Sequence, residues 1–122
     1  MSNVTELLDR YIATWNETDA DVRLREVARL WTADGVYTDP LASVRGHEAI
    51  AEVIGGAQQM FADHRFRLLD GVQAHHDIVR FGWELVPAGG GESVAIGLDV
   101  AALTDDGRIR LVHGFLDKAP GA

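Results

Sequence analysis

One acidic residue stands among small residues in a stretch that alternates like a β-strand. Residues 94–103 are almost entirely apolar, and successive side chains of a strand point to opposite faces. One face is bulky and aliphatic, as expected for packing on another layer: Val94, Ile96, Leu98, Val100 and Ala102. The opposite face surrounds Asp99 with mostly small neighbours: Ala95, Gly97, Ala101 and Leu103.

A buried carboxylate without a partner is costly and tends to take up a proton. Asp99 therefore needs either a structural partner, such as a helix end or a buried arginine, or a function in a site. Its small neighbours also leave space that a ligand, or large side chains from the helices, would fill. Because perturbed acids mark functional sites, we interpret Asp99 as a residue on the wall of an apolar pocket.

Two further polar residues could act with Asp99. Asp39 ends a β-rich segment immediately before Pro40, where Asp-Pro also opens many turns with the carboxylate bonded to local amides. Tyr11 shares an apolar helical face with Trp15, and an inward tyrosine is commonly a core residue whose hydroxyl has found a partner. Local features favour these structural roles, whereas convergence with Asp99 across one cleft would give both residues a chemical role.

The strands carry apolar and aromatic side chains at alternate positions, so these side chains share one face of the sheet. A face of this kind is ordinary core unless it borders a cleft. His113 stands on the opposite parity of the last strand, so we expect it to face the other side of the sheet. The residues expected to line a cleft are His64, Phe66, Phe81, Trp83, Val112 and Leu116.

Several common chemistries have no support in the sequence. There is no Gly-rich phosphate loop before a helix, no serine nucleophile elbow and no histidine pair at metal-binding spacing. His75 and His76 sit with Asp77 in a predicted turn, without a third ligand at useful spacing. We therefore expect neither a metal nor another cofactor.

The hydrophobic pattern predicts the element order α-α-β-α-β-β-β-β. Apolar residues recur at helical spacing over 4–15, 22–31 and 50–61, and the second helix is expected to end near Asp34-Gly35. Turn signals divide the remainder into four strands joined by short antiparallel hairpins, at approximately His64–Ala74, Ile78–Val86, Glu92–Leu103 and Arg108–Asp117. Helices on one side of a curved antiparallel sheet give a single α+β domain over residues 1–122, with an apolar pocket between the layers.

The composition of the chain limits the classes of partner that it is expected to bind. The chain has 122 residues, 47% of them hydrophobic, and a net charge of −8, which disfavours nucleic acids and anionic membranes. It has no cysteine, so disulfides and thiolate-bound metals are excluded. The first residues do not combine a basic segment with an apolar run, so we do not expect a secretory signal, and no run of about 18 apolar residues is found. We expect a cytoplasmic protein that binds a small apolar molecule.

In this order, the residues resemble the nuclear transport factor 2-like superfamily, especially its ketosteroid isomerase and SnoaL-like polyketide cyclase branches. The resemblance covers nearly the whole chain. Its best segments are Arg10-Tyr11-Ile12, Tyr37-Thr38-Asp39-Pro40 followed by Gly46, and Leu98-Asp99-Val100 leading into Asp106-Gly107-Arg108-Ile109. The resemblance implies a cone-shaped α+β barrel with its pocket inside the cone, commonly dimeric through the sheet.

The resemblance also implies site roles. Asp39 matches the isomerase's general base, while Tyr11 and Asp99 match its two oxyanion-hole donors. Trp31, which stands where the family has a supporting tyrosine, is added to the residues expected to contact substrate. The implied reaction is proton transfer next to the carbonyl of an apolar cyclic substrate, with the enolate oxygen held by Tyr11 and protonated Asp99.

Other activities of the superfamily remain open at this point. A cyclase would use an aspartate to shuttle a proton during an aldol closure. The epoxide hydrolase branch uses an arginine two residues before the strand aspartate, and that position is Gly97 here, so this activity is disfavoured. The alternative of a different class is a non-catalytic module of the same fold that binds an apolar ligand or dimerises.

Overall fold

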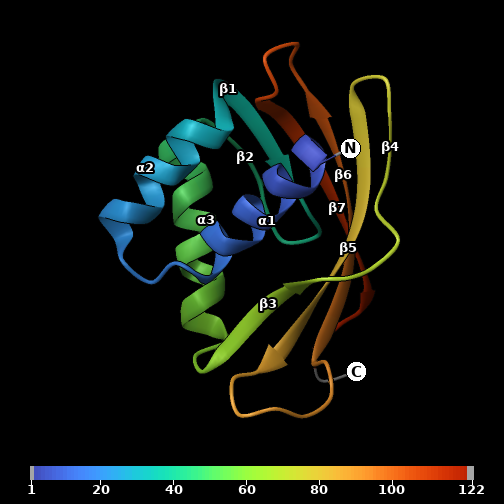
Figure 1. Ribbon diagram of the computed structural model, residues 1–122. Coiled ribbons are helices and arrows are strands. Elements are labelled where there is room, and N and C mark those ends of the chain that lie inside the picture. The colour runs from blue at the N-terminus through green and yellow to red at the C-terminus, as the bar shows by residue number, and fades with distance from the viewer. Residues whose placement is uncertain (1, 121–122) are drawn as a thin grey trace.

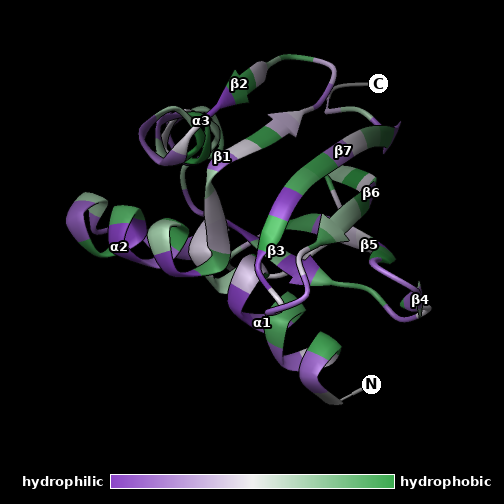
Figure 2. Ribbon diagram, turned by 90° about the horizontal axis from the view of Figure 1, so that it is seen from above, coloured by the Kyte–Doolittle hydropathy of each residue, from purple (hydrophilic) through white to green (hydrophobic). Residues whose placement is uncertain are grey.

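Three helices lie against one side of a curved seven-stranded sheet in the computed structural model, which describes residues 2–120 (Figure 1). The view from above in Figure 2 separates the helices from strands β5, β6 and β7. The helices are α1 (Ser2–Asn16), α2 (Ala20–Leu30) and α3 (His47–Met60). The strands are β1 (Trp31–Thr38), β2 (Ser43–Arg45), β3 (His64–Leu68), β4 (Gln73–His75), β5 (Ile78–Pro87), β6 (Ala95–Leu103) and β7 (Ile109–Lys118). The expected α+β architecture is confirmed. None of the helices described within residues 2–120 is both long enough and apolar enough to cross a membrane.

The sheet is open and mixed. Its strand order is β2-β1-β7-β6-β5-β3, and β4 pairs with β5 off this path. All pairs are antiparallel except β1 and β7, which run parallel. The expectation of a wholly antiparallel sheet is wrong at this pair. The strands after α3 form a run of antiparallel pairs. The last strand, β7, lies beside β1 and runs in the same direction.

Two short strands were not expected from the sequence. β2 forms a small hairpin with β1 directly after Asp39-Pro40. The expected single strand His64–Ala74 is divided into β3 and β4, which pair with different parts of β5. Gly71, between them, has φ +96°, a left-handed conformation that suits glycine and cannot continue a strand. The division lets the sheet bend around the helices.

Helix α2 is shorter than its hydrophobic pattern predicts. It begins at the N-cap Asp19, whose carboxylate accepts hydrogen bonds from the amides of Asp21 and Val22. It ends at Leu30, because Trp31 adopts an extended conformation and pairs with Ile109 of β7. The expected end near Asp34-Gly35 is therefore wrong, since pairing with β7 overrides the local helical period. Trp31 consequently projects from a strand.

The face of β6 that carries Asp99 borders the cavity, as expected, but the aliphatic face does not lie against the helices. The face with Asp99 is buried beneath the helices, and the aliphatic face is half-buried on the outer side of the sheet. Large aromatic side chains from the neighbouring strand compensate for the small residues of β6, because Trp83 pairs with Gly97 and Phe81 with Asp99. A Cβ atom at Gly97 would lie 2.2 Å from the Trp83 indole, so only glycine fits beneath this ring.

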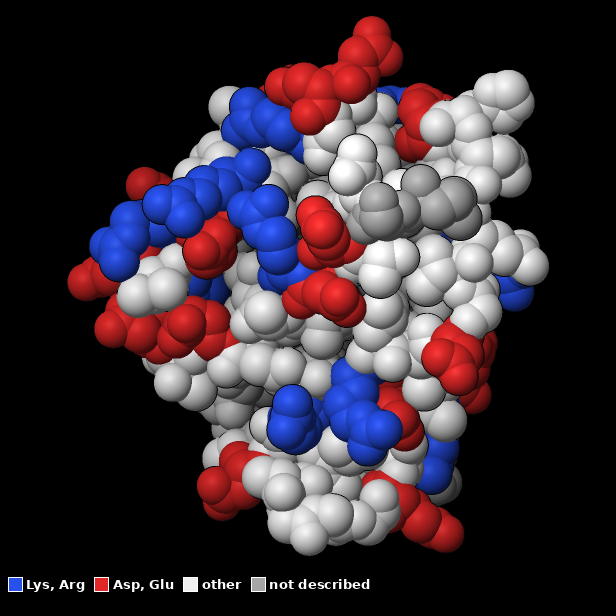
Figure 3. Space-filling view, in the orientation of Figure 1, with Lys and Arg blue, Asp and Glu red and all other residues white. Residues whose placement is uncertain are grey.

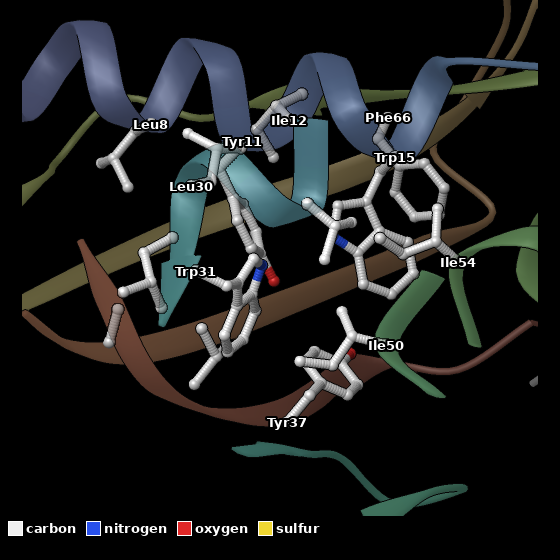
Figure 4. Close-up of a cluster of buried hydrophobic side chains, with 14 of the residues drawn as sticks. Leu8, Tyr11, Ile12, Trp15, Leu30, Trp31, Tyr37, Ile50, Ile54 and Phe66 are labelled. Carbon is white, nitrogen blue, oxygen red and sulfur yellow. The ribbon is translucent and has the colours of Figure 1, made fainter. Parts of the chain in front are cut away.

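Buried side chains from all three helices and the inner face of the sheet form one core (Figure 4). Helix α1 runs across it and places the ring of Tyr11 edge-on to Phe81, with 5.6 Å between ring centroids. Trp31 is 1% exposed and packs 6.3 Å from Tyr11, centroid to centroid. The core thereby fixes the position of Tyr11 relative to the sheet.

The contact between Trp83 and Gly97 leads to a stability prediction. In Gly97→Ala the new methyl group forces the indole off β6, and overpacking of this kind costs about 1–3 kcal/mol of unfolding free energy. Gly82→Ala on β5 is the matched control, because its added Cβ would meet its nearest neighbour at an ordinary 3.5 Å. Urea denaturation of both variants measures the difference, and equal stabilities would show that the indole does not depend on Gly97.

Candidate active site

A cavity of about 360 Å³ lies between helices α1 and α3 and the inner face of the sheet. Its open end carries two exposed apolar side chains, Leu41 and Met60, which are 78% and 64% exposed. Most of its wall is aromatic or aliphatic. The lining residues are Tyr11, Ile12, Trp15, Tyr37, Asp39, Pro40, Leu41, Ala57, Met60, Phe61, Phe66, Trp83, Leu85, Ala95, Asp99, Gly114, Phe115, Leu116, Ala119 and Pro120.

Asp99 lies in the wall of this cavity on β6 and is 4% exposed. Its Oδ1 accepts a hydrogen bond from the indole Nε1 of Trp83 at 3.2 Å, and no donor within residues 2–120 bonds Oδ2. Burial raises the pKa of Asp99 to about 7, the Trp83 hydrogen bond acts in the opposite direction, and the charge of Asp39 raises the pKa further. Asp99 is therefore neutral in much of the population near neutral pH and can then donate a hydrogen bond.

Asp39 follows β1 in a tight turn, and donors occupy both of its oxygens. Oδ1 accepts from the backbone amides of Leu41 at 2.8 Å and Ala42 at 2.9 Å, while Oδ2 accepts from the Tyr37 hydroxyl at 2.7 Å. The turn chemistry considered for Asp39 is therefore present, and the same residue also lines the cavity. Hydrogen bonds of this kind fix the orientation of the carboxyl group.

Gly114 of β7 allows the two carboxyl groups to approach one another. It pairs with Asp99, and a Cβ atom at this position would lie 2.8 Å from Asp99 Oδ1 and 3.5 Å from the Cβ of Asp39. A larger residue would fill the space between the two acids. Gly114 was not among the site residues predicted from the sequence.

Tyr11 reaches the cavity from α1. Its side chain is buried, and its hydroxyl has no hydrogen-bond partner within residues 2–120. Burial raises the pKa of Tyr11 well above its ordinary value, and the nearby charge of Asp99 adds to this effect. Tyr11 therefore remains protonated, with a donor available at the cavity. Buried polar groups are normally paired, so this hydroxyl has capacity for a bound water or ligand.

The structure brings together six of the residues predicted from the sequence. Asp39, Asp99 and Tyr11 share the cavity wall, as do the predicted contacts Phe66, Trp83 and Leu116. This placement gives them access to one ligand, while their roles in binding or catalysis remain predictions.

Four predicted contacts lie outside the cavity lining. Phe81 and Val112 are fully buried in the core behind Tyr11, and Trp31 packs against the backbone of Gly35, where a Cβ atom would lie 2.6 Å from its ring. His64 turns toward its own loop, with Nδ1 2.9 Å from the Ala62 carbonyl oxygen. Strand parity correctly places Phe81 and Val112 on the inner face of the sheet. It does not show how far along the strands the cavity extends, and side chains of the helices cover the part of this face where both residues lie.

Tyr37 was missed in the sequence as a site residue. Tyr37 and Asp39 are two positions apart at the end of a strand, so they share one face, and this spacing is the signal that could have identified the pair. Burial raises the pKa of Tyr37, as do the nearby Tyr11 and both acids. Its hydroxyl therefore acts as a donor to Asp39.

The burial of Asp99 leads to a prediction about stability and pH. The pKa of Asp99 rises from 3.8 to about 7 on folding. The unfolded chain therefore loses this proton first as the pH rises, and the free energy of unfolding falls. The contribution of Asp99 is fully present below pH 4 and is lost by about pH 7, a difference of about 4 kcal/mol. Asp99→Asn lacks this contribution. Urea denaturation of both proteins at each pH gives their free energies of unfolding, and the difference between wild type and Asp99→Asn is the contribution of Asp99. A pH-independent difference would contradict the raised pKa.

Comparison with known proteins identifies the family. The family model of the SnoaL-like domain matches residues 8–112. A provisionally assigned isomerase of the SnoaL-like family from Agrobacterium tumefaciens str. C58 is 38% identical, with a TM-score of 0.89 over 96% of this chain and 99% of that one. No protein of curated function matches.

More distant solved structures share the fold alone. A SnoaL-like protein of unknown function from Burkholderia thailandensis E264 is 17% identical, with a TM-score of 0.73 over 95% of this chain and 96% of that one. An NTF2-like protein of unknown function from Exiguobacterium sp. 255-15 is 18% identical, with a TM-score of 0.71 over 91% and 98%. The match to the family model and the 38% identity together show that this chain belongs to the SnoaL-like family, and its fold is NTF2-like.

Proposed function

We propose that the chain is a cofactor-independent enzyme that moves a proton at the carbon next to a carbonyl of an apolar cyclic substrate. The observation that carries this proposal is the pair of free hydrogen-bonding groups in an otherwise apolar wall. The Tyr11 hydroxyl and Asp99 Oδ2 have no partner within residues 2–120, and Asp39 lines the same cavity. One carbonyl oxygen could accept from both donors with its α-carbon facing the base.

The proposed reaction assigns one role to each of the three polar residues. Asp39 removes the α-proton as a carboxylate, and the electron pair of the broken C–H bond forms the enolate. Tyr11 and neutral Asp99 donate hydrogen bonds to the developing enolate oxygen, in surroundings where water does not weaken them. The proton then returns from Asp39 to the same carbon, or to a conjugated position in an isomerisation.

The chemistry of the wall supports a flat apolar substrate. Aromatic rings from Trp15, Phe66 and Trp83 stand around the cavity, whose charged groups are the two acids. On the surface shown in Figure 3, Lys and Arg lie among Asp and Glu rather than in one continuous basic patch. A neutral cyclic ketone fits these surroundings better than a phosphorylated substrate. The Agrobacterium relative's provisional assignment supports isomerisation over the cyclase reaction.

The second candidate function is non-catalytic binding of an apolar ligand. It is favoured by the hydrogen bonds of Asp39, because a carboxylate whose oxygens already accept from three donors is held in its turn and has less freedom to approach an α-carbon. In that case Tyr11 and Asp99 would hold a ligand oxygen without any chemistry. The two functions differ in what happens to the α-protons of a bound ketone.

Deuterium exchange separates the two functions. We expect the wild-type protein to exchange the protons next to the carbonyl of 2-tetralone, a bicyclic ketone, faster than buffer in D₂O, as followed by proton NMR. Asp39→Asn should lower the catalysed rate by roughly 10²–10⁴-fold, the range for loss of a general base, while the ketone still binds.

Two outcomes decide against catalysis by Asp39. Binding of 2-tetralone by calorimetry without exchange above the buffer rate would favour the ligand-binding module. Undiminished exchange in Asp39→Asn would show that Asp39 is not the base. Thr38→Ser is a control, because it alters the adjacent position at the end of β1, whose hydroxyl is exposed and contacts Ser43.

We also propose that the chain forms a homodimer through the outer face of the sheet. Ile96, Leu98 and Val100 of β6 are half-buried there, on the side of the sheet away from the helices. Phe115, the register partner of Leu98, is 58% exposed. An apolar sheet face of this kind supports association with a second copy.

Light scattering tests the dimer. We expect a mass of about twice the 13.3 kDa chain for wild type and of one chain for Leu98→Glu, since a charge in the centre of the interface opposes its burial. Leu24→Glu on α2 is the control, because Leu24 is also an exposed leucine but lies away from the sheet. A monomeric wild-type protein would contradict the proposal.

A further inference from the structure

Trp83 is the side chain that most tightly constrains the Asp99 carboxyl group. Trp83 pairs with Gly97, two residues before Asp99 on the adjacent strand, and its indole lies directly over that glycine. Phe66 also packs against the indole at 5.5 Å between centroids, in an edge-to-face arrangement. The indole thus contacts both a strand backbone and an aromatic ring, and its Nε1 donates to Asp99 Oδ1.

The chemistry of an indole determines what this contact does. The indole N–H is a donor only, whereas a neutral carboxyl group has one oxygen that carries the proton and one that accepts. Oδ1 accepts from Trp83, so the proton of neutral Asp99 belongs on Oδ2. Oδ2 is the oxygen that no donor within residues 2–120 bonds.

We propose that Trp83 is a positioning residue, whose N–H holds Asp99 Oδ1 so that the neutral carboxyl group presents its proton on Oδ2 to a ligand oxygen. This inference deepens the proposed function and rests on it for the identity of the ligand. The contact with Asp99 itself does not depend on catalysis. In this arrangement, Trp83 orients Asp99 much as the turn amides and Tyr37 orient Asp39.

The groups around Asp99 define the expected effect of removing this N–H. Asp39, at the end of β1, faces Asp99 and raises its pKa when charged. The other titratable groups around it, Tyr11 of α1 and Tyr37 of β1, keep their protons because their own pKa values are raised. A hydrogen-bond donor to a carboxylate favours the charged form. Loss of the Trp83 N–H therefore raises the pH at the midpoint of the Asp99 titration.

The test follows the Asp99 carboxyl carbon by ¹³C NMR in the ligand-free protein, with Asp99→Asn used to assign the signal. We expect a wild-type midpoint near pH 7 and a midpoint about one pH unit higher in Trp83→Phe, the size expected for a hydrogen bond to a charged group. Trp15→Phe removes another indole from the cavity wall that has no bond to Asp99, and its midpoint should remain that of wild type.

A variant that keeps the shape of the Trp83 ring separates loss of the N–H from a general packing effect. Benzothienylalanine at position 83 replaces the N–H with sulfur and should give the same shift as Trp83→Phe. An unchanged midpoint in this variant would overturn the inference, as would an equal shift in Trp15→Phe.

Ligand binding separates this inference from the proposed function. A ketone oxygen only accepts, so the affinity for 2-tetralone should fall above the Asp99 midpoint and be roughly three- to tenfold weaker in Trp83→Phe at pH 5, where Asp99 is neutral in both. Binding of 2-tetralone without deuterium exchange would contradict the proposed catalysis but would not affect the role of Trp83. A shifted midpoint with unchanged affinity at pH 5 would overturn the positioning role, since Trp83 would then tune Asp99 without orienting it.

Discussion

The site depends on the environment of one buried carboxyl group. Asp99 is placed by β6 in an apolar wall, where the only hydrogen bond to its carboxyl group within residues 2–120 comes from Trp83. Burial makes the neutral acid competitive with the anion, as its pKa of about 7 shows. A neutral acid can donate as well as accept, so the desolvation that weakens the fold also creates a donor. The surrounding residues either permit this arrangement or restrain it.

Close packing around this acid requires two glycines on adjacent strands. Gly97 accommodates the indole that bonds Asp99, and Gly114 leaves space between Asp99 and the turn of Asp39. Neither has a positive φ, so both are needed for space and not for an unusual backbone conformation. The parallel pairing of β1 with β7 is equally necessary, because it brings the end of β1, and with it Asp39, beside Gly114. Side chains 60 residues apart in the sequence thereby share one wall.

The sequence allows the fold class and the face of Asp99 to be predicted, because period-two alternation on β6 and helical spacing elsewhere are local properties. It also locates Asp39 and Tyr11 through the family resemblance. It does not give the depth of a residue along the cone, which is why Phe81 and Val112 were assigned to the cavity although they lie in the core. Trp31 was assigned to the site through the family resemblance, but it begins β1 and packs against Gly35. The contacts of Trp83 with Asp99 and of Tyr37 with Asp39 depend on register and rotamer, for which composition and periodicity carry little information.

In the proposed reaction, one ligand oxygen is held jointly by Tyr11 and neutral Asp99, within reach of Asp39. A crystal structure of the protein with 2-tetralone, grown at pH 5 so that Asp99 is protonated, tests it most directly. We expect the carbonyl oxygen at about 2.6–3.2 Å from both the Tyr11 hydroxyl and Asp99 Oδ2, with an α-carbon facing the Asp39 carboxylate. A ketone bound with its carbonyl toward the open end at Leu41 and Met60, leaving both donors unoccupied, would contradict it.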